Sequence, residues 1–175
     1  VADAQFNLAC YHAAGVGMPK NEVLAVKWYR RAAEQGHVKA MVNLALSLAA
    51  GKGCTKNETA AANWFEKAAE LGDTRAARMI AACFADGRGV HEDHVKSVMW
   101  YTKAAKQNDT KSQFNLGICY QEGRGVEKDP HKAAKWYWRA ANLGDTQAMY
   151  NLGCCYCEGF GVPEDSDKAT RWFAE

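Results

Sequence analysis

The chain has 175 residues, enough for one substantial domain or a short array of repeats. Its 22 basic and 20 acidic side chains nearly cancel, so charge gives no argument for a nucleic-acid partner. Hydrophobic residues make up 48% of the chain, yet no apolar run approaches the length of a membrane span. We therefore expect no nucleic-acid partner and no membrane segment. Because the chain opens on Val1 rather than Met, we expect it to be a piece of a longer protein.

A period of 36 residues runs through the whole chain. Five glycine pairs keep this spacing: Gly15/Gly17, Gly51/Gly53, Gly87/Gly89, Gly123/Gly125 and Gly159/Gly161. Five of the six tryptophans keep it too: Trp28, Trp64, Trp100, Trp136 and Trp172. The period predicts four complete repeats, over residues 3–38, 39–74, 75–110 and 111–146, and a partial repeat over 147–175.

Each repeat is predicted to hold two helices, helix A and then helix B. In the first repeat, Ala4, Leu8 and His12 recur at intervals of four residues, which places them on one stripe of helix A. The glycine pair ends helix A, because glycine adopts the left-handed conformation that follows a helix. Helix B then begins at a strong N-cap residue, one of Asn21, Asn57, Asp93, Asp129 and Asp165. We find no strand signal.

A helix pair of this length cannot bury its own apolar stripe, so neighbouring repeats must stack into one continuous core. The predicted fold is all-α, a right-handed α-α superhelix (solenoid) of antiparallel helix pairs, forming a single domain over residues 1–175. The partial fifth repeat stops in its second helix, just after Trp172 and Phe173. We therefore expect the natural protein to continue beyond this chain.

The run "SQFNLGICYQEGRGVEKDPHKAAKWYWRAANLGD" resembles the Sel-1-like repeat, a relative of the tetratricopeptide repeat with a longer loop between its helices. The resemblance extends over nearly the whole chain. It implies a scaffold or adaptor that binds a peptide or protein partner and has no catalysis of its own. As an alternative, such a chain is a regulatory or substrate-recruiting module of an enzyme complex, in degradation, kinase or cell-wall synthase regulation, whose catalytic part lies outside it.

The predicted binding surface is a varied strip on the helices A, which is expected to face the concave side of the solenoid. The strip continues through Gln121 and Cys154, and beside it runs a ladder of asparagines that is broken only by Met79. The predicted binding residues are Lys39, Asn43, Arg75, Arg78, Lys111, Phe114, Asn115, Tyr150 and Asn151. In the related tetratricopeptide repeats, the matching asparagine holds the main chain or terminal carboxylate of a ligand. The alternative is that each asparagine only bridges neighbouring helices.

No motif predicts catalysis, a cofactor or a metal. The sequence "EGRGV" has the glycines of a phosphate loop, but it follows a helix, lacks the Lys-Ser/Thr pair and occurs in five versions. The "HEDH" at His91–His94 offers too few ligands for zinc, because Asp93 is used as an N-cap. In "CCYC", Cys155 occupies the same position of its repeat as Cys83 and Cys119 do; we call such a set of equivalent positions a column. This column belongs to the predicted core, which favours packing over chemistry.

The seven cysteines favour a reducing compartment, and hence a cytoplasmic location. One secreted branch of the family joins helix B to the next helix A through cysteines at two columns, which here hold Ala33/Met41, Ala69/Ala77, Ala105/Gln113 and Ala141/Met149. Two glycosylation sequons, at Asn57 and Asn108, leave the endoplasmic reticulum lumen or secretion as the alternative.

Overall fold

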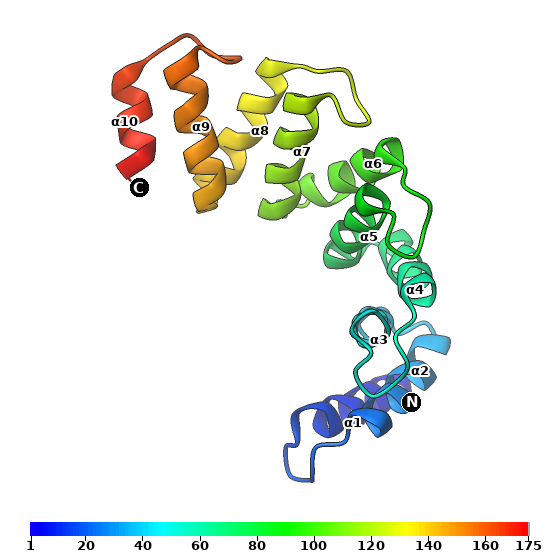
Figure 1. The fold of residues 1–175 in the computed structure, drawn as a ribbon. Helices are drawn as coiled ribbons and strands as arrows, with labels where there is room; N and C mark the ends of the chain where they lie inside the picture. Colours follow the sequence, from blue (N-terminus) through cyan, green and yellow to red (C-terminus); the bar gives the residue numbers. More distant parts are fainter. Residues whose placement is uncertain (175) are drawn as a thin grey trace. The chain divides into compact units, whose positions relative to one another are not determined.

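A computed structural model describes residues 1–174, which form ten α-helices joined by short loops and no strand (Figure 1). In chain order the helices are α1 (Ala2–Ala14), α2 (Glu22–Glu34), α3 (Val38–Ala50), α4 (Glu58–Glu70), α5 (Thr74–Asp86), α6 (His94–Ala105), α7 (Thr110–Glu122), α8 (Pro130–Asn142), α9 (Thr146–Glu158) and α10 (Ser166–Ala174). The odd-numbered helices are the predicted helices A and the even-numbered ones are the helices B. The all-α architecture of repeated helix pairs is confirmed.

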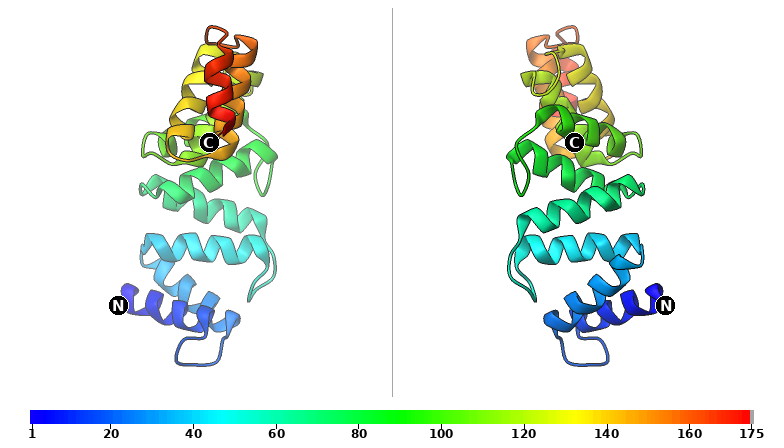
Figure 2. Two further views of the ribbon diagram at one scale, coloured as in Figure 1. Left: turned by 90° about the vertical axis from the view of Figure 1, so that its left-hand side faces the viewer. Right: turned by 90° about the vertical axis from the view of Figure 1, so that its right-hand side faces the viewer.

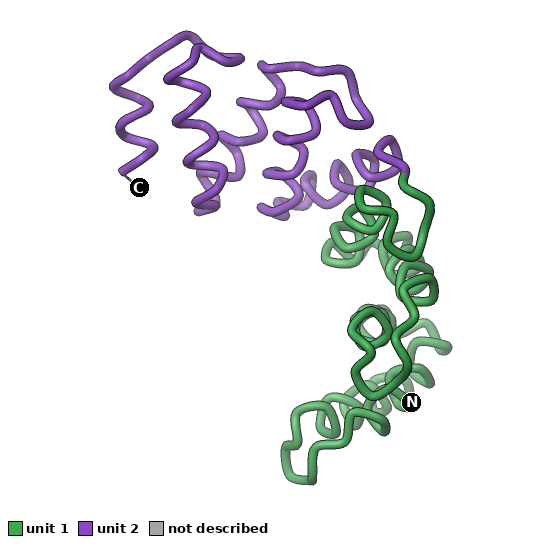
Figure 3. Tube along the Cα trace, in the orientation of Figure 1, with its two compact units in different colours: residues 1–92 green, residues 93–175 purple. Residues whose placement is uncertain are grey.

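The chain forms two compact units (Figure 3). Unit 1 comprises residues 1–92 and contains α1 to α5, whereas unit 2 comprises residues 93–175 and contains α6 to α10. Within each unit, consecutive helices lie side by side and reverse direction at each loop (Figure 2). The single domain that the period predicts stays a prediction.

Polar side chains cap the helices where the sequence predicts them. The side-chain oxygens of Asn21, Asn57, Asp93, Asp129 and Asp165 each accept a hydrogen bond from the backbone N–H three residues further on. Asp73, Asp109 and Asp145 cap the odd-numbered helices α5, α7 and α9 in the same way. In α3 the cap is His37, whose Nδ1 accepts from the backbone N–H of Ala40 at 3.1 Å.

The two glycines of each pair have different tasks. The first, such as Gly123 with φ of 75°, ends an odd-numbered helix in the left-handed conformation, as predicted. The second packs against the preceding repeat: a Cβ added to Gly125 would overlap the backbone carbonyl of His94 at the start of α6. Gly17, in the first repeat, has no such neighbour within residues 1–174. The second glycine is therefore needed for contact between repeats as well as for the turn.

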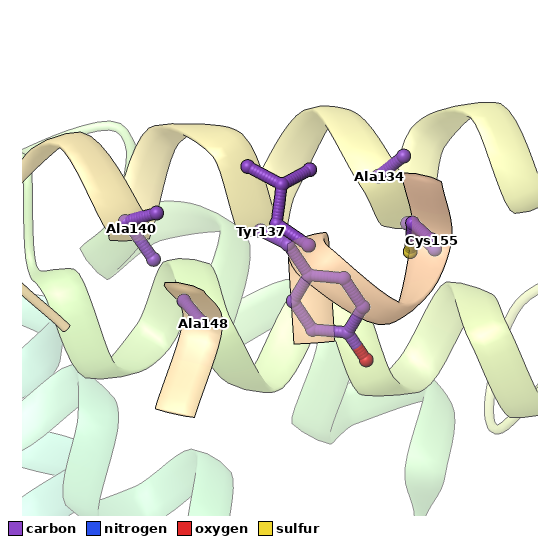
Figure 4. Packing of buried hydrophobic residues seen from close by; sticks show 8 residues of the cluster. Ala134, Tyr137, Ala140, Ala148 and Cys155 are labelled. Atoms are coloured by element: carbon purple, nitrogen blue, oxygen red, sulfur yellow. The ribbon is translucent and has the colours of Figure 1, made fainter. Parts of the chain in front are cut away.

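The core of unit 2 is built from small side chains around one large ring. Figure 4 shows the fully buried Tyr137 between the side chains of Ala148 and Cys155. On α7, Gly117 faces the same ring so closely that an added Cβ would overlap it. The alanines and glycines bring the helices near enough for a single aromatic side chain to fill the space between them.

The core of unit 1 follows the same pattern. Phe65 on α4 is 1% exposed, and the fully buried Leu44 and Ile80 lie on the flanking helices α3 and α5. Alanine occupies the position of Gly117 in α1 and α3, as Ala9 and Ala45, both of which are fully buried. The two units thus share a frame of alanine and one central ring per repeat.

Candidate functional site

All nine predicted binding residues lie on odd-numbered helices. Four belong to unit 1 and five to unit 2. Those of unit 1 are Lys39, Asn43, Arg75 and Arg78, and those of unit 2 are Lys111, Phe114, Asn115, Tyr150 and Asn151. Because the two sets lie in different units, the predicted convergence of Arg75 and Arg78 with the residues of unit 2 stays a prediction.

Three of the predicted cations lie near the beginnings of helices. Lys39, Arg75 and Lys111 are each the second residue of α3, α5 and α7, and each is exposed. The positive end of the helix dipole disfavours a cation there, so helix stability does not explain these residues. Their charges are available to an acidic partner.

The aromatic residues of the strip contact the core. The Phe114 ring lies 5.9 Å from that of Tyr137, and the Tyr150 ring lies 5.7 Å from that of Phe173. Phe6 and Tyr29 form the equivalent pair in the first repeat, at 6.0 Å. Phe114 is partly buried and packs against the core of unit 2, whereas Tyr150 is 63% exposed. Of the two, Tyr150 therefore offers more surface to a partner.

Two asparagines of the ladder contact the central tyrosine of the preceding repeat. Burial raises the pKa of Tyr137, and a hydrogen bond with Asn151 acts in the opposite direction. A hydrogen bond that lowers the pKa of a phenol favours the phenolate, so the Asn151 amide donates to the hydroxyl. Burial likewise raises the pKa of Tyr29, while Asn43 lowers it. These bonds are the bridge between helices that the second interpretation of the ladder expects.

The one position without asparagine, Met79, is explained by the same contact with the central ring of the preceding repeat. Met79 replaces asparagine on α5, and the central ring of the preceding repeat is Phe65, which has no hydroxyl to bind. Both side chains line one small cavity in unit 1, so they lie close together. Asparagine thus occurs after a tyrosine and methionine after the phenylalanine, which favours a bridging role. A role in ligand binding stays a prediction.

A hollow opens between α7 and α9 in unit 2, and we call it the α7–α9 hollow. Its volume is about 600 Å³. It is lined by Gln121 and Glu122 of α7, by Asn151, Cys154, Cys155 and Glu158 of α9, and by Lys128 and Phe160 of the loops. The lining therefore combines amides, both signs of charge and one aromatic ring.

Contacts within the unit hold this lining in place. The Tyr137 hydroxyl donates to Gln121 Oε1 at 2.7 Å, and Arg124 Nε pairs with Glu122 Oε2 at 2.6 Å. Lys128 Nζ lies 5.9 Å from the centre of the Phe160 ring, so a cation and an aromatic ring are adjacent. Of the predicted binding residues only Asn151 lines the hollow. Lys128 and Phe160 were missed because both lie in loops outside the predicted strip.

Unit 1 has smaller cavities in the same register. One, of about 250 Å³, is lined by Ala13, Lys20, Tyr29, Ser47 and Lys52 among others. The position of Gln121 is held by alanine in the first three repeats, as Ala13, Ala49 and Ala85. A cavity at this position therefore occurs in both units, and in unit 2 it is larger and its lining is more polar.

The family of this chain follows from its repeats. The sequence pattern of the Sel1 repeat matches residues 2–37, 38–73, 74–109, 110–145 and 146–175. The chain is a member of the Sel1 repeat family. Each match begins one residue before the corresponding predicted repeat. With these bounds both helices of a pair lie within one repeat, as α1 and α2 do within residues 2–37. Sel1 repeat proteins are generally protein-interaction scaffolds, and their fold is typically non-catalytic.

Solved structures of Sel1 repeat proteins are similar to this chain throughout. A Sel1 repeat protein from Oxalobacter formigenes is 35% identical with a TM-score of 0.96, covering 99% of this chain and 71% of its own. A protective antigen of uropathogenic Escherichia coli strains, which displays the same repeat fold, is 32% identical with a TM-score of 0.97. That match covers 99% of this chain but only 37% of the antigen. No protein of curated function matches.

A cysteine-rich member of the family gives a useful contrast. Cysteine-rich protein B of Helicobacter pylori is 28% identical with a TM-score of 0.56, covering 70% of this chain and 93% of its own. In the present Sel1 repeat protein all seven cysteines are free thiols. Burial raises the pKa of Cys119 and of Cys155 to about 11, which keeps both protonated and unreactive near neutral pH. Their environment therefore supports the predicted packing role.

The described part of the chain holds neither a metal-binding cluster nor a membrane-spanning helix. Residues 1–174 contain no group of three or more His, Cys, Asp or Glu side chains placed to hold a metal ion. In the same range, every helix is too short or too polar to cross a membrane.

Proposed function

We propose that this Sel1 repeat protein is a non-enzymatic scaffold whose helix-A surface binds a segment of a protein partner. In unit 2, we place that segment in the α7–α9 hollow. The observation behind the proposal is the polar hollow of about 600 Å³, which is lined by two helices A and the loops that follow them. A volume of this size accommodates a few residues of an extended chain.

The lining has the chemistry to hold a peptide. Gln121 and Asn151 each bond Tyr137, and each amide keeps further donor or acceptor capacity for a peptide backbone. Lys128 and Glu158 place opposite charges on the lining, and the Phe160 ring offers an apolar surface. Backbone binding by amides gives affinity, whereas the charges and the ring select the side chains of the partner.

Substitutions to residues that other repeats carry at the same positions test the proposal. Gln121→Ala introduces the residue of the first three repeats, and Phe160→Arg introduces the residue found at Arg88 and Arg124. We expect the double variant to lose most partner capture in a pull-down from cells that express the natural full-length protein. The loss follows because one amide is removed together with the one aromatic ring that lines the hollow among residues 1–174.

The matched control is Lys135→Glu, an exposed position of α8 that lies outside the hollow. Circular dichroism should show the same helix content for the double variant and the control. The unfolding midpoint of the double variant should fall slightly, because Gln121→Ala removes the acceptor of the Tyr137 hydroxyl and Phe160 packs against the core of unit 2. Unchanged capture by the double variant, with capture lost only on changes elsewhere, would show that the hollow is not the binding site.

A further inference from the structure

A second pocket lies at the other end of unit 2, and we call it the polar pocket. It has a volume of about 460 Å³ and is formed where α6 and α8 end and α7 begins. Its lining includes Lys106, Asn108, Gln113, Trp138, Arg139 and Leu143. Gln113 and Gln121 lie eight residues apart on α7, about 12 Å along the helix, so the polar pocket is separate from the α7–α9 hollow.

Gln113 has hydrogen-bonding capacity that the fold leaves unused. The residue is only 2% exposed, and its Nε2 donates to the carbonyl oxygen of Ala105 at 3.2 Å. Within residues 1–174, its buried Oε1 has no hydrogen-bond partner. A buried acceptor without a donor is costly, and Met41 and Met149 show that the repeat accepts an apolar side chain here. A donor from a ligand would satisfy this free acceptor.

An apolar surface lies beside this acceptor. Trp138 is the only one of the six tryptophans that falls outside the repeated column. Its side chain does not fill the core, because the residue is 51% exposed, and Leu143 of the same lining is 50% exposed. Exposed tryptophan in a pocket is a frequent anchor for protein partners.

The charge of the polar pocket is reversed relative to the first two repeats. Lys106 occupies the column of Glu34 and Glu70, and Trp138 occupies that of Arg30 and Glu66. Arg139 adds a second cation, and its guanidinium is supported by the Trp136 ring at 4.7 Å. Glu34, Glu70 and Glu66 of unit 1 are thus matched in unit 2 by Lys106, Asn142 and Trp138, and Asn142 also lines the pocket. This change favours a ligand with negative charge.

We propose that the polar pocket binds an extended peptide segment of a protein partner in which an acidic residue is followed by an apolar one. The carboxylate pairs with Lys106 and Arg139, and the apolar side chain lies on Trp138 and Leu143. An N–H of the segment donates to Gln113 Oε1. This site is independent of the one in the α7–α9 hollow, and either can fail without the other.

The test is a titration of the ¹⁵N-labelled protein with a short acetylated peptide of repeating Glu-Leu steps. The counterpart with Lys in place of Glu has the same apolar content and serves as the peptide control. We expect the indole N–H of Trp138, assigned with Trp138→Phe, and the side-chain amide of Gln113 to shift and saturate with the acidic peptide only. The resonances of the α7–α9 hollow should not move.

Two substitutions that introduce residues found at equivalent positions of other repeats test the proposed contacts of Gln113 and Lys106 with the peptide. Gln113→Met introduces the residue of Met41 and Met149, and Lys106→Glu introduces that of Glu34 and Glu70, so both preserve the fold. Each should weaken binding of the acidic peptide about tenfold, Gln113→Met because it removes a buried acceptor and Lys106→Glu because it replaces an attracting charge with a repelling one. Lys135→Glu alters net charge as much as Lys106→Glu does and should leave binding unchanged.

Three results would overturn the assignment. One is the absence of any shift at Trp138 with the acidic peptide, and another is an equal shift with the basic one. The third is a shift of Trp138 that depends on protein concentration alone, which would identify a second copy of the chain as the occupant.

Discussion

Units 1 and 2 share a buried frame but differ in the side chains around it. In both units alanines surround one large ring per repeat, as at Phe65 and Tyr137. At the ends of the helices B, however, unit 1 places Glu34 and Glu66 where unit 2 places Lys106 and Trp138. Stacking requires the core columns to be alike in every repeat, whereas the surface is free to differ. Surface positions whose side chain differs from the equivalent positions of other repeats are therefore the candidates for binding sites.

The largest effect should come from the contact between repeats. Gly125→Ala forces a Cβ into the backbone of α6 and strains a left-handed residue, so we expect it to lower the free energy of unfolding by about 3 kcal/mol. Gly17→Ala has the same backbone strain but no neighbour, and should cost about 1 kcal/mol. Urea unfolding of both variants measures the difference. Equal losses would contradict a packing role for the second glycine.

A smaller effect is expected where the units differ inside the core. Gly117→Ala places a methyl group against the fully buried ring of Tyr137, and we expect a loss of about 2 kcal/mol despite the better helix propensity of alanine. At the equivalent position of unit 1, Ala45→Gly should cost about 1 kcal/mol through propensity. Thermal and urea unfolding report both values. A stabilised Gly117→Ala variant would refute the close contact.

The asparagine bridge predicts coupling between two residues of unit 2. Asn151→Met and Tyr137→Phe together reproduce the Met79–Phe65 pair of unit 1. Asn151→Met removes the donor to the Tyr137 hydroxyl, which keeps its bond to Gln121, and Tyr137→Phe leaves the Asn151 amide without that acceptor. The double variant should therefore be more stable than the sum of the singles by about 1 kcal/mol. A double-mutant cycle by urea unfolding measures this coupling. Strict additivity would instead leave Asn151 free for a ligand.

The smallest expected effect is a loss of stability at the helix N-caps of unit 2 at acidic pH. Unit 1 caps its helices B with Asn21 and Asn57, whereas unit 2 uses Asp93, Asp129 and Asp165. Hydrogen bonds from the backbone N–H and ammonium of Lys132 lower the pKa of Asp129. Its contribution to stability is present above the ordinary pKa of about 3.9 and is lost as pH falls through the lowered value.

The start of α8 should therefore open more in acid than the start of α4. A hydrogen bond with Lys56 lowers the pKa of Glu58 in unit 1, but such exposed ion pairs contribute little to stability. Amide hydrogen exchange at about pH 3 and pH 7 measures the opening. Asp129→Asn should make α8 less sensitive to acid. Equal sensitivity of the variant and the parent protein would show that the cap does not titrate as described.

Most of the fold could be predicted because the period specifies it. A glycine pair and an N-cap at fixed spacing define the loop of every repeat, and Asp129 and Gly123 cap their helices as expected. His37 was not predicted as the cap of α3, because histidine is not among the usual N-cap residues. The contact of Gly125 with the preceding repeat also escaped prediction, since it depends on how closely the helices pack.

Less of the candidate site could be predicted. Helix periodicity places Phe114 on the strip and Asn151 on the ladder beside it, but it does not show that both also contact Tyr137. Two features of the sequence indicate the polar pocket: Trp138 lies outside the column of the other tryptophans, and Lys106 lies in the column of Glu34 and Glu70. Only the packing of α6, α7 and α8 brings Lys106, Gln113 and Trp138 to one pocket.

Site-specific photo-crosslinking tests the central claim most directly. Benzoylphenylalanine replaces Phe160 in the α7–α9 hollow in one protein and Lys135 on the outer face of α8 in another, both in the full-length protein in its native cells. The account predicts a covalent adduct with one protein partner from position 160, lost when Gln121→Ala is added, and none from position 135. An adduct from position 135 with none from position 160 would contradict it.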